Sequence, residues 1–143
     1  MTTLRNILGL IAGIMLILSS GAHSILGWKG LSQKLAAINV PADLVFGIKA
    51  GWEFGGVAML VFGVIVVVAF VGRLRGRNAA TFPSLMIAIG FLGIGAWALV
   101  ASNFAGFFWL FIVIGLLLLI GAWPSSNSFG VGRGDAESSD YIH

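Results

Sequence analysis

Four hydrophobic stretches, each near the length of a membrane-spanning helix, take up most of this sequence of 143 residues. A helix rises about 1.5 Å per residue, so about 20 apolar residues are needed to cross a hydrocarbon core of about 30 Å. The stretches cover residues 7–26, 46–71, 82–101 and 104–123. We therefore predict an all-α fold in which residues 1–123 form an integral membrane four-helix bundle.

The composition supports this class of protein. Apolar residues make up 59% of the chain and charged residues 9%, whereas a soluble domain has about a quarter charged residues. The net charge of +3 is the difference between eight Lys and Arg residues and five Asp and Glu residues. Because the basic residues are scattered between the apolar stretches, we expect the lipid bilayer, and not nucleic acid, as the partner. The absence of cysteine excludes disulfides, iron–sulfur clusters and thiolate zinc sites.

Two segments fall outside the four stretches. Between the first two, apolar residues recur at helical spacing opposite lysines within Trp28 to Leu44, which predicts a short interfacial helix lying on the membrane surface. Val40-Pro41 is expected to end it, because the residue before proline avoids helical angles. Beyond Pro124 the sequence turns to Ser, Asn, Gly and acids, so we predict a polar cytoplasmic tail at residues 124–143.

Positive charge predicts the orientation. The residues used are Arg5, Arg73, Arg75 and Arg77. If the side of the membrane that holds these arginines is cytoplasmic, the chain crosses the inner (plasma) membrane of the cell with both termini in the cytoplasm. Tryptophans then fall near the two boundaries, as in the aromatic belts of membrane proteins: Trp28, Trp52 and Trp109 near the outer one and Trp123 near the inner one. The segment from Met1 to Ala22 also fits a cleaved signal peptide, but the apolar stretch continues to Leu26, which favours a first span.

Glycines spaced four residues apart predict where helices pack closely. These glycines are Gly9 and Gly13 in the first stretch and Gly47, Gly51 and Gly55 in the second. Such a stripe removes side chains from one helix face and lets another backbone approach.

Three polar residues are predicted to lie at similar depth near the outer boundary: His23, Lys49 and Glu53. They would form a structural cluster, with Glu53 paired to Lys49, or they would carry protons or hydrogen-bond a quinone carbonyl. His23 is the single histidine of the membrane portion, and His143 ends the tail on the far side, so two histidines of one chain cannot ligate a haem. We expect no cofactor and no metal.

The segment Glu53-Phe54-Gly55-Gly56, followed by Met59, Leu60 and Gly63, resembles the second helix of DoxX-like proteins. Gly21 and His23 stand where the first helix of that family has a glycine followed by a polar residue, with histidine in place of the usual lysine. Another departure is that nine residues separate Gly63 from Arg73, where the family has an arginine sooner. The resemblance implies a four-helix membrane protein that assembles with redox enzymes feeding the quinone pool.

These observations lead us to expect a non-catalytic membrane subunit or scaffold that packs against other membrane subunits or against itself. Two alternatives stay open. One is a small proton-linked transporter in which Glu53 exchanges protons. The other is a quinone-proximal accessory subunit, which the polar cluster and the family resemblance both suggest.

Overall fold

The structure is a computed structural model that describes residues 2–123, and its regular secondary structure over that range is helical. Along the chain the elements are α1 (Thr2–Gly21), the π-helix η1 (Ala22–Gly27), α2 (Trp28–Ala37), α3 (Ala42–Leu74), α4 (Phe82–Ala101), the 3-10 helix η2 (Gly106–Phe108) and α5 (Trp109–Ala122). The all-helical prediction is confirmed. Three helical stretches are long and apolar enough to cross a membrane, namely Thr3–Ala37, Ala42–Leu74 and Phe82–Ala101.

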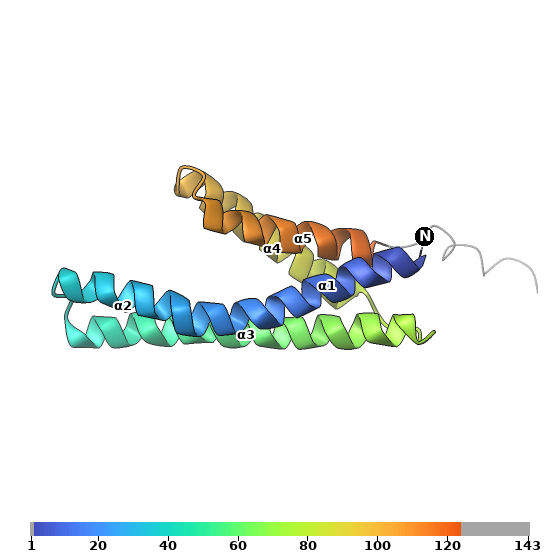
Figure 1. Cartoon of the computed structure of the whole chain (residues 1–143), viewed down its shortest axis with the longest axis horizontal. Coiled ribbons are helices and arrows are strands. Elements are labelled where there is room, and N and C mark those ends of the chain that lie inside the picture. The colour runs from blue at the N-terminus through green and yellow to red at the C-terminus, as the bar shows by residue number, and fades with distance from the viewer. Residues whose placement is uncertain (1, 124–143) are drawn as a thin grey trace, which may run out of the picture.

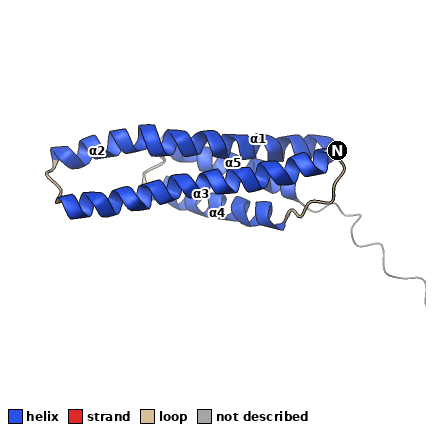
Figure 2. Cartoon of the chain, turned by 90° about the horizontal axis from the view of Figure 1, so that it is seen from below, coloured by secondary structure: helices blue, strands red, loops and turns tan. Residues whose placement is uncertain are grey.

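The helices form two antiparallel hairpins of unequal length. In the longer one, α1, η1 and α2 run beside α3, and in the shorter one α4 runs beside α5 (Figure 1). The two hairpins join where α1 packs against α5, while α3 and α4 have little contact. Seen from below, the α2 end of the long hairpin extends well past α4 and α5 (Figure 2).

The segment that we expected to lie flat on the membrane instead continues the first helix. α2 is helical and amphipathic, but η1 links it to α1 without a break, and Trp28 has the helical angles φ −62° and ψ −43°. The resulting helical stretch has 35 residues and measures about 52 Å. It is therefore longer than the hydrocarbon core of about 30 Å.

The turns between helices contain residues with positive φ, which asparagine adopts more readily than phenylalanine. Asn39 has φ 50° between α2 and α3, and Asn103 and Phe104 have φ 52° and 64° between α4 and η2. α3 begins at Ala42, directly after Pro41. This start lies four residues before the predicted start at residue 46. The fourth stretch is interrupted early, because the 3-10 turn of η2 precedes α5.

The core is densest at the end of the molecule where α1 begins and α3 and α5 end. Phe70 is fully buried and lies against Gly9, where a β-carbon would overlap its ring. A β-carbon on Gly121 would lie 2.9 Å from the Cα of Gly9 and 3.1 Å from the carbonyl oxygen of Arg5. Close packing at this end joins the two hairpins, and they separate toward the other end (Figure 1).

Candidate functional site

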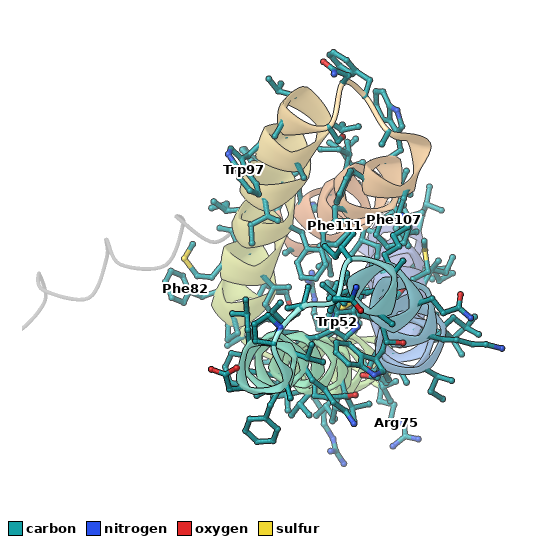
Figure 3. All side chains as sticks on the ribbon, turned by 90° about the vertical axis from the view of Figure 1, so that its left-hand side faces the viewer. Trp52, Arg75, Phe82, Trp97, Phe107 and Phe111 are labelled. Atoms are coloured by element: carbon teal, nitrogen blue, oxygen red, sulfur yellow. The ribbon has the colours of Figure 1, made fainter. Side chains whose placement is uncertain are left out.

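A cavity of about 460 Å³ lies where the two hairpins separate. One side of it is formed by the end of α1, by η1 and by α3, and the other by α4, η2 and α5. In the view along the long axis, Phe107 and Phe111 of the short hairpin lie across from Trp52 of α3, while Trp97 and Phe82 point away from the interior (Figure 3). Cavities of 300–1,000 Å³ are of the size that holds small organic ligands.

His23 and Trp52 form the polar border of this cavity. Their rings stack with centroids 4.3 Å apart and planes 7° from parallel. Each ring also bonds to the other residue's backbone: the Trp52 Nε1–H donates to the His23 carbonyl at 2.8 Å, and His23 Nε2 lies 3.1 Å from the Trp52 carbonyl oxygen. The two side chains therefore hold each other in one orientation.

This geometry fixes the tautomer of the neutral imidazole. A carbonyl oxygen only accepts hydrogen bonds, so His23 Nε2 carries the proton and donates it to Trp52. In the neutral ring Nδ1 is then an acceptor. Within residues 2–123 no hydrogen bond is made to His23 Nδ1, and Nδ1 lies on the ring edge away from Gly55, whose nearest neighbour is Nε2. Nδ1 of the neutral His23 ring is thus an available acceptor on a residue that lines the cavity.

Glycines on both helices make room for this pair. A β-carbon on Gly55 would lie 3.3 Å from His23 Nε2, and one on Gly27 would lie 2.7 Å from the Trp52 ring. The π-helical turns of η1 lie at this contact, and insertions of this kind are frequent at functional sites. One turn earlier, the buried Ser20 hydroxyl donates to the carbonyl of Gly56 at 2.7 Å, which ties α1 to α3.

The opposite wall of the cavity is aromatic. Phe91 of α4 and Phe111 of α5 stack with centroids 5.6 Å apart, and Phe107 meets Phe111 edge to face at 6.1 Å. Leu110 and Met59 add aliphatic and thioether surface. In the described part of the chain no charged side chain lines this cavity, so it suits an uncharged molecule.

The structure does not bring the predicted cluster of His23, Lys49 and Glu53 together in this cavity. Lys49 is exposed, and its Nζ lies 5.8 Å from the ring centroid of Trp28. Glu53 is half-buried and is not among the residues that line the cavity. For Glu53 the reason is helical geometry, because consecutive residues point about 100° apart and Trp52 is the residue that faces η1.

The predicted topology residues divide into two groups. Arg5 donates from Nε to the Ile120 carbonyl at 3.1 Å, and Arg73 donates from Nη1 to the Gly121 carbonyl at 3.2 Å. Arg75 and Arg77 are exposed in the connection that follows α3. The last carbonyls of a helix have no N–H group of a following turn to bond to, and two arginines supply donors to such carbonyls at the end of α5.

The predicted packing glycines also divide. Gly9, Gly13 and Gly55 lie close to side chains of the neighbouring helix, whereas a β-carbon on Gly47 or Gly51 would have open space. Among the belt tryptophans, Trp109 and Trp123 are exposed, Trp28 is half-buried, and Trp52 packs inward on His23.

Sequence reasoning missed the aromatic wall and the role of Trp52. Phe91, Phe107 and Phe111 lie among other apolar residues with no distinguishing pattern, and only the pairing of the hairpins brings them together. For Trp52 the neighbouring Gly55 and Gly56 were a usable signal, since they mark a face of α3 that another helix approaches.

Within residues 2–123 no group of three or more His, Cys, Asp or Glu side chains is placed to hold a metal ion. Comparison with protein-family models, with curated proteins and with solved structures gives no match. The function is therefore argued from the geometry of this chain.

Proposed function

We propose that this protein is a non-catalytic integral membrane subunit whose long hairpin binds a partner membrane protein. The observation that carries the proposal is the difference in length between the two hairpins. α3 has 33 residues and measures about 50 Å, whereas α4 has 20 residues and measures about 30 Å, the thickness of the hydrocarbon core. The tip of the long hairpin, formed by α2 and the start of α3, thus reaches past the short one, and no other helix of residues 2–123 packs around it.

The charges support this placement in the membrane. Counting about 20 residues back along α3 from Arg73 leads to Glu53, so the segment before Glu53 lies beyond the hydrocarbon core. That segment and α2 contain Lys29, Lys34, Asp43 and Lys49. With the arginine end inside, as positive charge favours, the hairpin tip lies on the outer side of the inner membrane.

The binding face is the side of α3 that carries Gly47 and Gly51. Both positions have open space around them, and the exposed rings of Phe46 and Phe54 flank them. Two glycines four residues apart leave a groove into which a second helix packs. Gly51 and Gly47 lie about 3 and 9 Å beyond Glu53 along α3, so the partner helix would extend past the hydrocarbon core as α3 does. A helix of a partner subunit is the occupant that this face fits.

The test compares two glycine positions that are both open in the structure. Gly51→Leu fills the proposed groove on α3, and Gly90→Leu adds the same side chain to an open face of α4. The measurement is the mass of the complex extracted from native membranes in mild detergent. We expect wild type and Gly90→Leu to migrate as the same complex, above the mass of a single chain, and Gly51→Leu to shift to the single chain.

A wild-type protein that extracts as a solitary monomer of 15.0 kDa would contradict the proposal. So would a complex that survives Gly51→Leu unchanged. Site-specific photo-cross-linking from position 51, compared with position 89 on the lipid-exposed side of α4, identifies the neighbour and separates a partner subunit from a second copy of this chain.

The transporter alternative finds less support in this geometry. A proton-exchanging carboxylate is expected to face the pathway of its substrate. Glu53 lies on α3 next to Trp52 but does not line the cavity.

A further inference from the structure

We propose that the cavity between the hairpins binds a neutral, lipid-soluble aromatic molecule that carries a hydroxyl group, and that His23 Nδ1 accepts the hydrogen bond from that hydroxyl. This proposal goes beyond the assembly role and does not depend on it. It rests on the shape and lining of the cavity and on His23 Nδ1, the imidazole nitrogen that is left without a hydrogen bond within residues 2–123.

The first step is the charge of the ligand. No charged side chain of residues 2–123 lines the cavity, and its walls are the apolar and aromatic side chains of both hairpins. An ion placed there would lose its hydration without gaining a counter-charge. The occupant is therefore neutral.

The second step is the polar end of the ligand. Because His23 Nε2 donates to the Trp52 carbonyl, the neutral ring offers an acceptor, and no donor, at Nδ1. An ether or a ketone, which lacks a donor, gains nothing from Nδ1, whereas a hydroxyl donates to it. The Ser19 hydroxyl also lines the cavity and is able to accept or donate in a second bond.

The third step is the body of the ligand. Phe91, Phe107 and Phe111 present ring faces and edges on the wall opposite Trp52. Aromatic rings pack on such surfaces in offset or edge-to-face arrangements. A flat aromatic ring would pack against this wall, within the cavity.

The position in the membrane agrees with this orientation. His23 is 18 residues along the chain from Arg5, which places it about 27 Å from the arginine end, near the opposite boundary of the hydrocarbon core. Met59 and Ile114, which also line the cavity, lie deeper along their helices. A bound phenol would keep its hydroxyl near the boundary and its apolar part in the hydrocarbon region.

The test uses a matched pair of probes, 4-hexylphenol and its methyl ether, with the purified full-length protein in phospholipid nanodiscs. The two probes have nearly the same apolar body, but only the phenol donates a hydrogen bond. We expect saturable binding of both, with the phenol bound about five- to tenfold more tightly, which is the effect of one hydrogen bond. Absence of saturable binding, or equal affinity for the two probes, would overturn the proposal.

A variant assigns the preference to His23. His23→Phe keeps a ring stacked against Trp52 and removes Nδ1, so we expect the phenol to bind no more tightly than the ether. A preference for the phenol that persists in a folded His23→Phe protein would contradict the role of Nδ1. The comparison of probes in the wild-type protein stands even if this variant does not fold.

A photoreactive alkylphenol locates the bound molecule. We expect covalent label on cavity residues such as Leu110 and Met59, reduced by excess 4-hexylphenol. Label confined to lipid-exposed residues such as Val68 and Ile89 would show simple partitioning into the bilayer and would overturn the proposal.

Discussion

Glycine at position 121 lies at the tightest contact between the two hairpins. A β-carbon there would approach backbone atoms of Gly9 and Arg5 to 2.9–3.1 Å, and backbone atoms yield less readily than the end of a side chain. Gly63 has a similar contact with the backbone of Gly13 and Ile17, at 3.0 Å in both cases. These glycines are required by close approach and not by a special backbone angle.

We predict that Gly121→Ala destabilises the folded protein by about 1–3 kcal/mol, the range measured for overpacked cores. Gly90→Ala is the matched control, because it adds the same methyl group on a helix where nothing lies within 4 Å. Thermal unfolding in detergent, followed by circular dichroism, measures both. Equal midpoints for the two variants would contradict the packing described here.

Trp52 illustrates what could be read from the sequence at this scale. Its place near a predicted membrane boundary suggested an interfacial anchor, yet its ring stacks on His23. A tryptophan near a boundary serves either role, and the choice depends on which face of α3 meets α1. That choice follows from the stripe of α3 that holds Gly56 and Gly63, which are buried against η1 and α1.

Helix α5 is stabilised at its end by residues from two other helices. The carbonyls of Ile120 and Gly121 accept hydrogen bonds from Arg5 of α1 and Arg73 of α3. A cation at the carboxyl end of a helix also interacts favourably with the helix dipole. The arginines that predicted orientation thus have a structural role as well.

We expect Arg73→Gln to lower the free energy of unfolding by about 1.5–3 kcal/mol, the contribution of a hydrogen bond to a charged group. Arg75→Gln removes the same charge from a side chain that lies two residues further along the chain and is exposed. It should therefore leave stability nearly unchanged. Chemical denaturation in detergent compares the two. If Arg75→Gln were as destabilising as Arg73→Gln, the hydrogen bond to Gly121 would not be the cause.

Some elements were more predictable than others. α4 has the bounds Phe82–Ala101, where Pro83 in the first turn marks the start and the Ser102-Asn103 turn marks the end. The continuity of α1 and α2 was not predicted, because the amphipathic pattern within Trp28 to Leu44 suggested a separate helix on the membrane surface. The π-helical η1 lies at the tertiary contact between His23 and Trp52, which local sequence patterns do not encode.

At the scale of the whole molecule, the arrangement has a closed end and an open end. Arg5, Arg73 and the ends of α3 and α5 gather at the closed end, where Gly9, Phe70 and Gly121 pack tightly. The open end carries the cavity and the projecting tip of the long hairpin (Figure 1). The proposed partner face and the proposed ligand site thus belong to the same half of the protein.

We propose that this chain lies across the membrane with its arginine end inside and the tip of the long hairpin outside. Since the chain has no cysteine, a single introduced cysteine provides a unique label. Lys34→Cys places it in α2, and Asn78→Cys places it between α3 and α4; both positions are exposed. The reagent is a membrane-impermeant maleimide applied to intact cells; where the cells have an outer membrane, that membrane is opened first. We predict that position 34 is labelled at once and that position 78 is labelled only after the inner membrane is opened. Labelling at position 78 in intact cells, with position 34 protected, would contradict the account.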